Sequence, residues 1–284
     1  MKSRRVIQAI LATALAACST TWAEDRSLPG RFEIEIGGYF VTKIDTVALF
    51  ARKAGPIEAG TLIDFSKDLG LAGSKSIPRV DGLYRFNRKS SVSFSLWDIE
   101  RDATVFLGTG IDFGDISIPV GELVESVFDA TTIRASYGYS FYNVPKAELG
   151  INAGLHLTTF DLGISCLSCS NEDLVDFESV SAPLPVLGLH FRYQMSRRWN
   201  FSGYTQHFLL DYGDFSGSLT DTRFAFSHHT FKNVGFGFGW NRIQTDIDID
   251  SSEYLMVVDN KLDGIQAYIV VYAGRPKHFE NQKE

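Results

Sequence analysis

The stretch Glu148-Leu-Gly-Ile-Asn-Ala-Gly-Leu-His-Leu-Thr158 determines the fold class of this chain. Every odd-numbered position in it is apolar, whereas the even-numbered positions carry Glu, Gly, Asn, Gly, His and Thr. Successive side chains of a β-strand point to opposite faces, so a period of two gathers the apolar residues on one side. The stretch therefore predicts a strand that is apolar on one face only.

The same alternation recurs in residues 132–142, 188–195 and 234–241. It predicts ten spanning strands, near residues 31–43, 77–87, 90–101, 125–142, 147–160, 183–195, 199–210, 221–231, 233–246 and 262–273. Two further short strands are expected at Thr61–Phe65 and Ile111–Ile118, in hairpins outside the membrane. If those two also span, the count becomes twelve, which is again an even number.

Alternation fits both a soluble protein and a membrane barrel, so other features must decide. The only long apolar run, Val6–Ala17, is too short for a membrane-spanning helix, which excludes a helical membrane protein. Gly, Ser and Asn on the polar face favour a narrow, crowded barrel interior. Aromatic residues fall near strand ends, as in interfacial girdles: Tyr139, Phe141, Tyr142, Tyr193, Trp199, Trp240, Tyr268 and Tyr272. We therefore expect an all-β, antiparallel, up-and-down transmembrane β-barrel; a secreted β-sandwich or a lipocalin-like barrel is the alternative.

The N-terminus predicts export. Lys2, Arg4 and Arg5 precede the apolar run, and small residues then lead to Ala23 and an acidic pair. This order is typical of a secretory signal peptide, residues 1–23. We expect a periplasmic segment at 24–30, the barrel at 31–273 and a polar periplasmic tail at 274–284. As an alternative, Leu15-Ala-Ala-Cys18 resembles a lipobox, in which Cys18 would become the lipidated first residue.

Charge and cysteine content limit the partners. The formal net charge is −7, and cleavage of the signal peptide would remove three bases and no acid, which excludes nucleic acid as a partner. The same cleavage leaves Cys166 and Cys169, for which a local disulfide is expected in an oxidising compartment, with free thiols as the alternative. A CxxC metal or redox site would need a second ligand pair or a thioredoxin-like context. We expect neither a metal nor a cofactor.

The connections alternate in length and charge. Short basic ones lie at 87–90, 143–146, 196–198 and 232–233, and long acidic ones at 44–75, 102–125, 161–181, 211–221 and 246–263. Outer-membrane barrels have short periplasmic turns and longer outer loops. We therefore expect a location in the outer membrane with both chain ends in the periplasm.

The predicted register also assigns the lumen. The inward residues are Glu33, Glu35, Arg79, Asp81, Arg85, Arg134, Glu148, His156, His190 and Arg192. Acids and bases are mixed, and ten strands enclose little more than the eight that side chains can fill. We expect these charges to pair across the lumen; a narrow channel or transporter for small or hydrophobic solutes is the alternative function.

Two motifs suggest chemistry only weakly. Asp246, Asp248 and Asp250 share a strand face and could crowd oxygen atoms around Ca²⁺, but no EF-hand loop is present. Ser227 and His229 share another face, as the Ser and His of a membrane-rim lipid hydrolase would, but no hydrolase signature surrounds them. We expect a structural or interaction role, presented by acidic outer loops, without enzymatic chemistry.

Three segments carry a family resemblance: Ile63-Asp-Phe-Ser-Lys-Asp-Leu-Gly-Leu71, Arg79-Val-Asp-Gly-Leu-Tyr-Arg-Phe86 and Tyr137-Gly-Tyr-Ser-Phe141. With the alternation over residues 31–273, they resemble bacterial outer-membrane β-barrel proteins, loosely the small barrels of the OmpA and OmpW kind. The resemblance implies outer-membrane lipid as surroundings and insertion by the barrel-assembly machinery, and it transfers no catalytic residue. Such barrels usually end on an aromatic residue, whereas here Tyr272-Ala273 is followed by a polar tail.

Overall fold

The computed structural model describes residues 31–52, 60–113, 116–169 and 175–273. The predicted signal peptide, Cys18, the 24–30 segment and the polar tail lie outside these residues. The described strands are β1 Phe32–Arg52, β2 Ile63–Asp64, β3 Lys75–Arg85, β4 Ser90–Phe106, β5 Ile111–Phe113, β6 Ile116–Ile118, β7 Leu123–Val144, β8 Ala147–Cys166, β9 Val175–Gln194, β10 Trp199–Tyr212, β11 Phe215–His229, β12 Val234–Asp250 and β13 Tyr254–Ala273. Within these ranges no helix is long and apolar enough to cross a membrane.

Ten strands form a closed antiparallel ring, which confirms the predicted fold and a count of ten rather than twelve. The order is β1, β3, β4, β7, β8, β9, β10, β11, β12 and β13, and β13 pairs with β1 to close the ring. β2 pairs only with Val47 and Ala48 of β1, and β5 with β6 forms a separate hairpin. The two short predicted strands are therefore not part of the barrel wall.

Each wall strand changes its polarity half-way along. In β12, the outward residues Phe236, Phe238 and Trp240 give way to Arg242 and then to acids, while the inward residues change from glycine to isoleucine. The outward apolar residues form an apolar band around the half of the barrel that carries the short turns. Beyond this band the interior is mainly apolar and the outside is mainly polar; we call that half the head.

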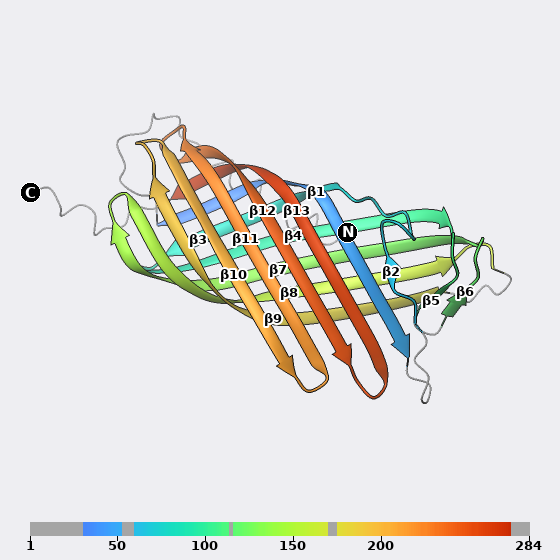
Figure 1. Ribbon diagram of the computed structural model, residues 1–284. Helices are drawn as coiled ribbons and strands as arrows, with labels where there is room; N and C mark the ends of the chain where they lie inside the picture. Colours follow the sequence, from blue (N-terminus) through green and yellow to red (C-terminus); the bar gives the residue numbers. More distant parts are fainter. Residues whose placement is uncertain (1–30, 53–59, 114–115, 170–174, 274–284) are drawn as a thin grey trace, which may run out of the picture.

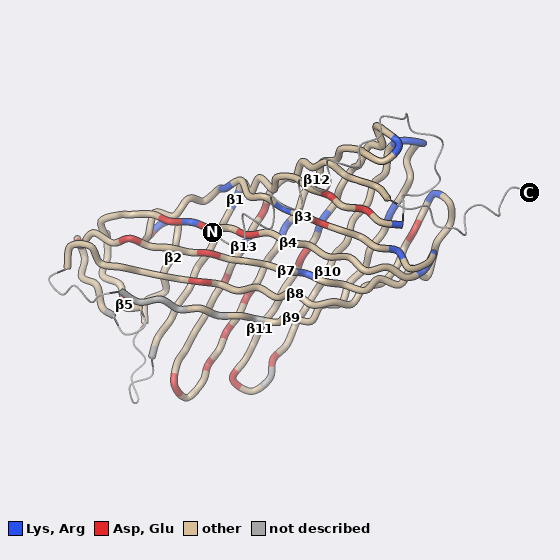
Figure 2. Tube along the Cα trace, turned by 180° about the vertical axis from the view of Figure 1, so that it is seen from behind, with Lys and Arg blue, Asp and Glu red and all other residues tan. Residues whose placement is uncertain are grey.

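The long acidic connections are shorter in the structure than the sequence predicted. The reason is the change of polarity along the wall strands. Residues 211–221 contain a tight turn at Gly213, whose φ of 61° suits glycine, and residues 246–263 are mostly strand. Outward acids in these stretches suggest loops, but they alternate with inward Leu219, Ile247 and Val258, so the strands continue into water. Figure 2 shows acidic residues at these hairpin tips and basic residues at the short-turn end.

The ring divides into two sheets in the head. The register of β9 with β10 ends where Leu187 lies opposite His207, although β8 accompanies β9 as far as Val175. The register of β3 with β4 likewise begins at Arg79. Pro185 and Pro78 stand beside these two limits, and proline, which lacks an N–H, is tolerated at strand edges. Figure 1 shows β10 to β13 diverging from β4, β7, β8 and β9 toward the head.

An apolar core fills the space between the two sheets of the head. Phe128, Phe160 and Leu162 come from one sheet, and Ile247 and Val258 from the other. Two connecting segments complete this core: the plug segment, residues 61–71, with Ile63, Phe65, Leu69 and Leu71, and residues 107–118, with Leu107, Ile111, Phe113 and Ile118. The head is therefore packed shut like a β-sandwich.

Two features of the wall differ from simple alternation. A bulge between Val41 and Lys43 shifts the register of β1, so that the inward residues are odd-numbered before it and even-numbered, beginning with Ile44, after it. Tyr268 and Tyr272, which we expected in an interfacial girdle, instead point inward and are buried. The girdle prediction was wrong for these two because they share a face with the buried Gln266 and Val270.

Candidate functional site: the charged lumen

The short-turn half of the barrel encloses the lumen. All ten predicted lumen residues point into it: Glu33, Arg79, Asp81, Arg134, Glu148 and His156 are buried, whereas Glu35, Arg85, His190 and Arg192 are partly exposed and line a cavity. They come from β1, β3, β7, β8 and β9, so residues distant in sequence meet in one space.

At the short-turn end the charges pair across the barrel. Both guanidinium NH groups of Arg192 donate to the carboxylate of Glu33, at 3.0 and 3.1 Å. Arg85 donates to Glu148 at 2.9 Å. Glu148 also accepts from the Ser140 hydroxyl at 2.5 Å, and its carboxylate lies 3.8 Å from His190 Nε2. These contacts bind β1 to β9, and β3 to β8.

Ser140, His190 and Glu148 are a Ser–His–carboxylate group that the alternation pattern did not single out. In a hydrolase the carboxylate orients the histidine through the ring nitrogen opposite the serine. Here His190 Nε2 faces both the Ser140 hydroxyl, at 3.3 Å, and Glu148. The carboxylate therefore holds the serine rather than orienting a base.

Glycine makes room for this group. A Cβ atom at Gly150 would lie 2.4 Å from His190 Cε1 and 2.5 Å from the carbonyl oxygen of Tyr139. The position accepts no side chain unless the neighbouring strand moves. The glycines of the polar strand face thus reflect crowding in the lumen.

A second network occupies the middle of the lumen. Arg79 donates to both carboxylate oxygens of Asp81 and, at 2.6 Å, to Asn241 Oδ1. The amide of Asn241 donates to Asp221 at 2.7 Å, and Asp221 lies 3.6 Å from Arg134. The Arg134 guanidinium also stacks over the ring of Tyr204, 4.1 Å from its centroid.

Sequence reasoning missed several lumen residues, of which six join the charged networks. They are Tyr204, Gln206, Asp221, Arg223, Asn241 and Gln266. His156 lies 3.0 Å from Gln206, and Arg223 binds Glu35 and, at 2.7 Å, Gln266. Period two continued through β10 to β13 would have placed these residues inside. Asp221 escaped notice because it was assigned to an outer loop.

A cavity of about 130 Å³ remains between the two networks. Its charged lining contains four arginines, Arg85, Arg134, Arg192 and Arg223, and four acids, Glu33, Glu35, Asp81 and Glu148. The charges are balanced, and each of these arginines has an acidic partner in the lumen. Because a buried unpaired charge is very costly, removing one partner is expected to disturb the others.

The residues of the two weakly suggested sites lie at opposite ends of the barrel. His229, at the short-turn end, stacks on the ring of Tyr272, with 4.1 Å between centroids. Asp246, Asp248 and Asp250 are exposed on the outside of the head. Among the described residues, His, Cys, Asp and Glu side chains spaced for a metal ion occur at Glu122, Cys166 and Cys169. The two cysteines form the predicted disulfide.

Comparisons with known proteins were made on sequence and on structure. No family model and no curated protein matches the sequence. The outer membrane protease OmpT from Escherichia coli is similar in structure, with a TM-score of 0.51 and 11% identity over 86% of this chain and 97% of that one. The chain has the fold of bacterial outer-membrane β-barrels.

Two weaker likenesses are of the same kind. The outer membrane protein OprG from Pseudomonas aeruginosa has a TM-score of 0.38 and 12% identity over 87% of this chain and 97% of that one. The attachment invasion locus protein Ail of Yersinia pestis has a TM-score of 0.31 and 9% identity, over 85% and 99%. All three sequence identities are low, so the comparisons leave the activity open.

Proposed function

We propose that this chain is a non-conducting outer-membrane barrel that holds its head outside the cell as an interaction surface, without enzymatic chemistry. The observation that carries the proposal is that the interior is closed at two levels, in the lumen and in the head. The lumen is crossed by ion pairs, such as Arg192 with Glu33, and the head is packed with apolar side chains. A solute would have to disrupt both layers in order to pass.

The outside of the head supports an interaction role. Phe106, Val120 and Leu167 are 71%, 63% and 54% exposed, although they lie beyond the apolar band. Two of them adjoin Leu123, since Phe106 is opposite Leu123 in the register and Leu167 N donates to the Leu123 carbonyl at 2.8 Å. Exposed apolar residues that adjoin one another in a patch, unlike single scattered ones, mark interaction sites on water-facing surfaces.

Orientation follows from the two ends of the barrel. The short-turn end is basic and carries the described chain ends, whereas the head is acidic outside (Figure 2). In our proposal the short turns lie in the periplasm, the apolar band contacts outer-membrane lipid, and the barrel-assembly machinery inserts the chain.

Conductance in planar bilayers tests closure. We expect no unitary currents from protein whose insertion has been verified by heat-modifiable gel mobility. Stable currents that are abolished by a bulky residue at Gly154 or Gly188, where a Cβ would lie 2.2 and 2.0 Å from neighbouring atoms, would overturn the proposal in favour of a channel.

Labelling of intact cells tests orientation. We expect a membrane-impermeant maleimide to modify Ser252→Cys, in the β12–β13 turn, and to leave Lys89→Cys, in a short turn, unmodified until the cells are lysed. The reverse pattern would place the head in the periplasm.

A further inference from the structure

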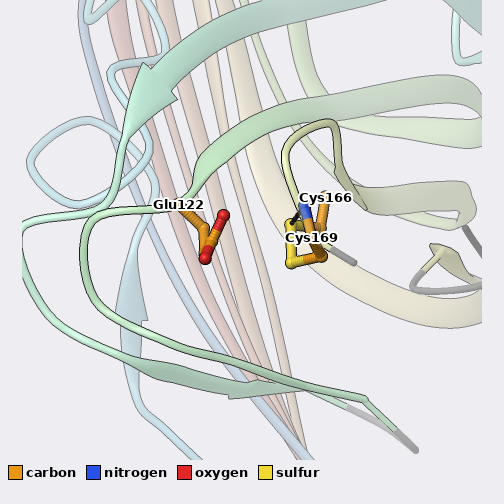
Figure 3. A group of neighbouring side chains, drawn as sticks. All are labelled: Glu122, Cys166 and Cys169. Carbon is orange, nitrogen blue, oxygen red and sulfur yellow. Dashed lines mark hydrogen bonds between the residues drawn. A yellow bond between two sulfur atoms is a disulfide. The ribbon is translucent and has the colours of Figure 1, made fainter. Parts of the chain in front are cut away.

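The end of β8 and the start of β7 meet at the outer rim of the head. Leu167 N donates to the Leu123 carbonyl at 2.8 Å, and Leu123 N donates to Ser168 Oγ at 2.7 Å. The Ser168 hydroxyl in turn donates to Glu122 at 2.5 Å. These bonds fix the Glu122 carboxylate beside the Cys166–Cys169 loop, as Figure 3 shows.

The spacing of these three side chains suits a metal ion. One carboxylate oxygen of Glu122 and the two sulfur atoms all lie within 4.8 Å of one another. With Zn–S bonds of about 2.3 Å and Zn–O bonds of about 2.0–2.2 Å, ligands of a tetrahedral zinc stand roughly 3.5–3.8 Å apart. The two sulfur atoms are bonded to each other in the disulfide, so they can reach this separation only after reduction, whereas the Glu122 oxygen already lies within 4.8 Å of both.

The loop backbone is also arranged for chelation. The Cα atoms of Cys166 and Cys169 are 5.7 Å apart, a separation that allows both sulfurs to reach one ion. The N–H of Cys169 donates to Cys166 Sγ at 3.1 Å, so the backbone of the loop folds around that sulfur. All three side chains are partly exposed, so an ion can reach them.

We propose that reduction of the Cys166–Cys169 disulfide converts this rim group into a Zn²⁺ site, with two thiolates and the Glu122 carboxylate as ligands and water in the fourth position. A phosphine supplies the two electrons for the reduction and becomes a phosphine oxide, while one water molecule supplies its oxygen and the protons of the two thiols. Zinc then displaces the two thiol protons. The mixed sulfur and oxygen ligands favour Zn²⁺ over Cu⁺, which prefers sulfur alone.

The two states connect different parts of the chain. The disulfide closes only its own short loop, with a sequence separation of 3. The zinc ion would instead join the β8 end to Glu122, which precedes β7. Metal binding is therefore expected to stabilise the reduced head, because a ligand that binds only the folded state raises its stability.

Zinc titration of the reduced, detergent-folded chain tests the proposal. A phosphine is used because dithiols bind zinc, and a chromophoric chelator reports the free metal. We expect one Zn²⁺ per reduced chain, bound at least 100-fold more tightly than by the oxidised chain, with a rise in Tm. The Cys166→Ser/Cys169→Ser variant is expected to lose both effects. Equal affinity of the reduced, oxidised and double-serine proteins would overturn the site.

Glu122→Gln tests the third ligand separately. Glutamine can still accept the Ser168 hydrogen bond, so the rim should remain folded, whereas zinc affinity should fall at least tenfold. The matched control is Glu125→Gln, because Glu125 is exposed on the outer face of β7 and should leave the affinity unchanged. If Glu122→Gln binds zinc as tightly as Glu125→Gln, the proposed ligand set is wrong.

Discussion

Arg192 and Glu33 form a bidentate pair across the full width of the barrel. Arg192 belongs to β9 and Glu33 to β1, and these strands are five places apart in either direction around the ring of ten. Two parallel N–H···O bonds between diametrically opposite strands act as a brace that fixes the width of the lumen.

Removal of one partner should therefore be more harmful than removal of both. We expect Arg192→Met to lower the free energy of unfolding by about 3–5 kcal/mol, because Glu33 remains buried without its partner. Arg192→Met/Glu33→Met should recover much of that loss. Urea unfolding in detergent measures these free energies. Lys43→Met is the control: Lys43 forms an exposed pair with Asp45, so its loss should cost less than about 1 kcal/mol. If the double variant loses as much stability as the two single variants together, the pair is not a brace.

The plug segment should contribute strongly to the stability of the head. Phe65 is fully buried and its ring meets that of Phe128 edge-on, with 5.5 Å between centroids. We expect Phe65→Ala to cost about 3–5 kcal/mol, as the loss of a buried aromatic ring usually does. Leu62→Ala is the control, since Leu62 is 59% exposed and should be nearly neutral. Thermal unfolding followed by gel mobility compares them; equal midpoints would mean that the segment does not pack in the head.

Arginine substitutions on the neighbouring strands β11 and β12 test where the apolar band ends. Phe238 of β12 faces outward within the band, so Phe238→Arg should cost about 2–4 kcal/mol in lipid. Ser216 of β11 lies outside in the head, opposite Asp211 and Asp248, so Ser216→Arg should be tolerated. Folding yield in liposomes measures both, and a neutral Phe238→Arg would indicate that this face does not contact lipid.

Docking of the plug segment should weaken in acid. Burial of Asp64 opposes its ionisation, but hydrogen bonds from the Lys67 side chain and from the backbone N–H groups of Ser66 and Lys67 outweigh burial and lower the pKa of Asp64. A lowered pKa in the folded state gives stability that is present at neutral pH and is lost as the pH falls below about 4.

Hydrogen exchange reads out this acid effect. We expect protection of the Phe65 amide, which donates to the Thr46 carbonyl, to fall between pH 5 and pH 2.5 after correction for intrinsic rates. Asp64→Asn should show less of this pH dependence, whereas the exposed Asp248→Asn should behave like the parent chain. The same pH dependence in all three proteins would assign the effect to other groups.

The alternation of apolar and polar residues could predict the strands of the wall and most residues of the lumen. Side chains of a strand point to the same face every two residues, whatever surrounds the strand. It placed Glu148 and His156 inside and Leu149 and Leu157 outside, as the structure has them. It could not predict the bulge near Val41, because one extra residue exchanges the two faces without leaving a distinctive residue type. Which acid meets which base depended on the ring order and on the relative shift of distant strands.

The sequence by itself determined that this chain forms alternating strands, where their short turns fall and that they form an antiparallel barrel. Only the tertiary structure decided that the barrel has two interiors. An apolar residue such as Leu157 or Leu162 has the same hydrophobicity in both halves, yet the first faces outward and the second faces the head core. The alternation is the same in either case, because it records that the two faces differ and not which of them meets lipid, water or another sheet.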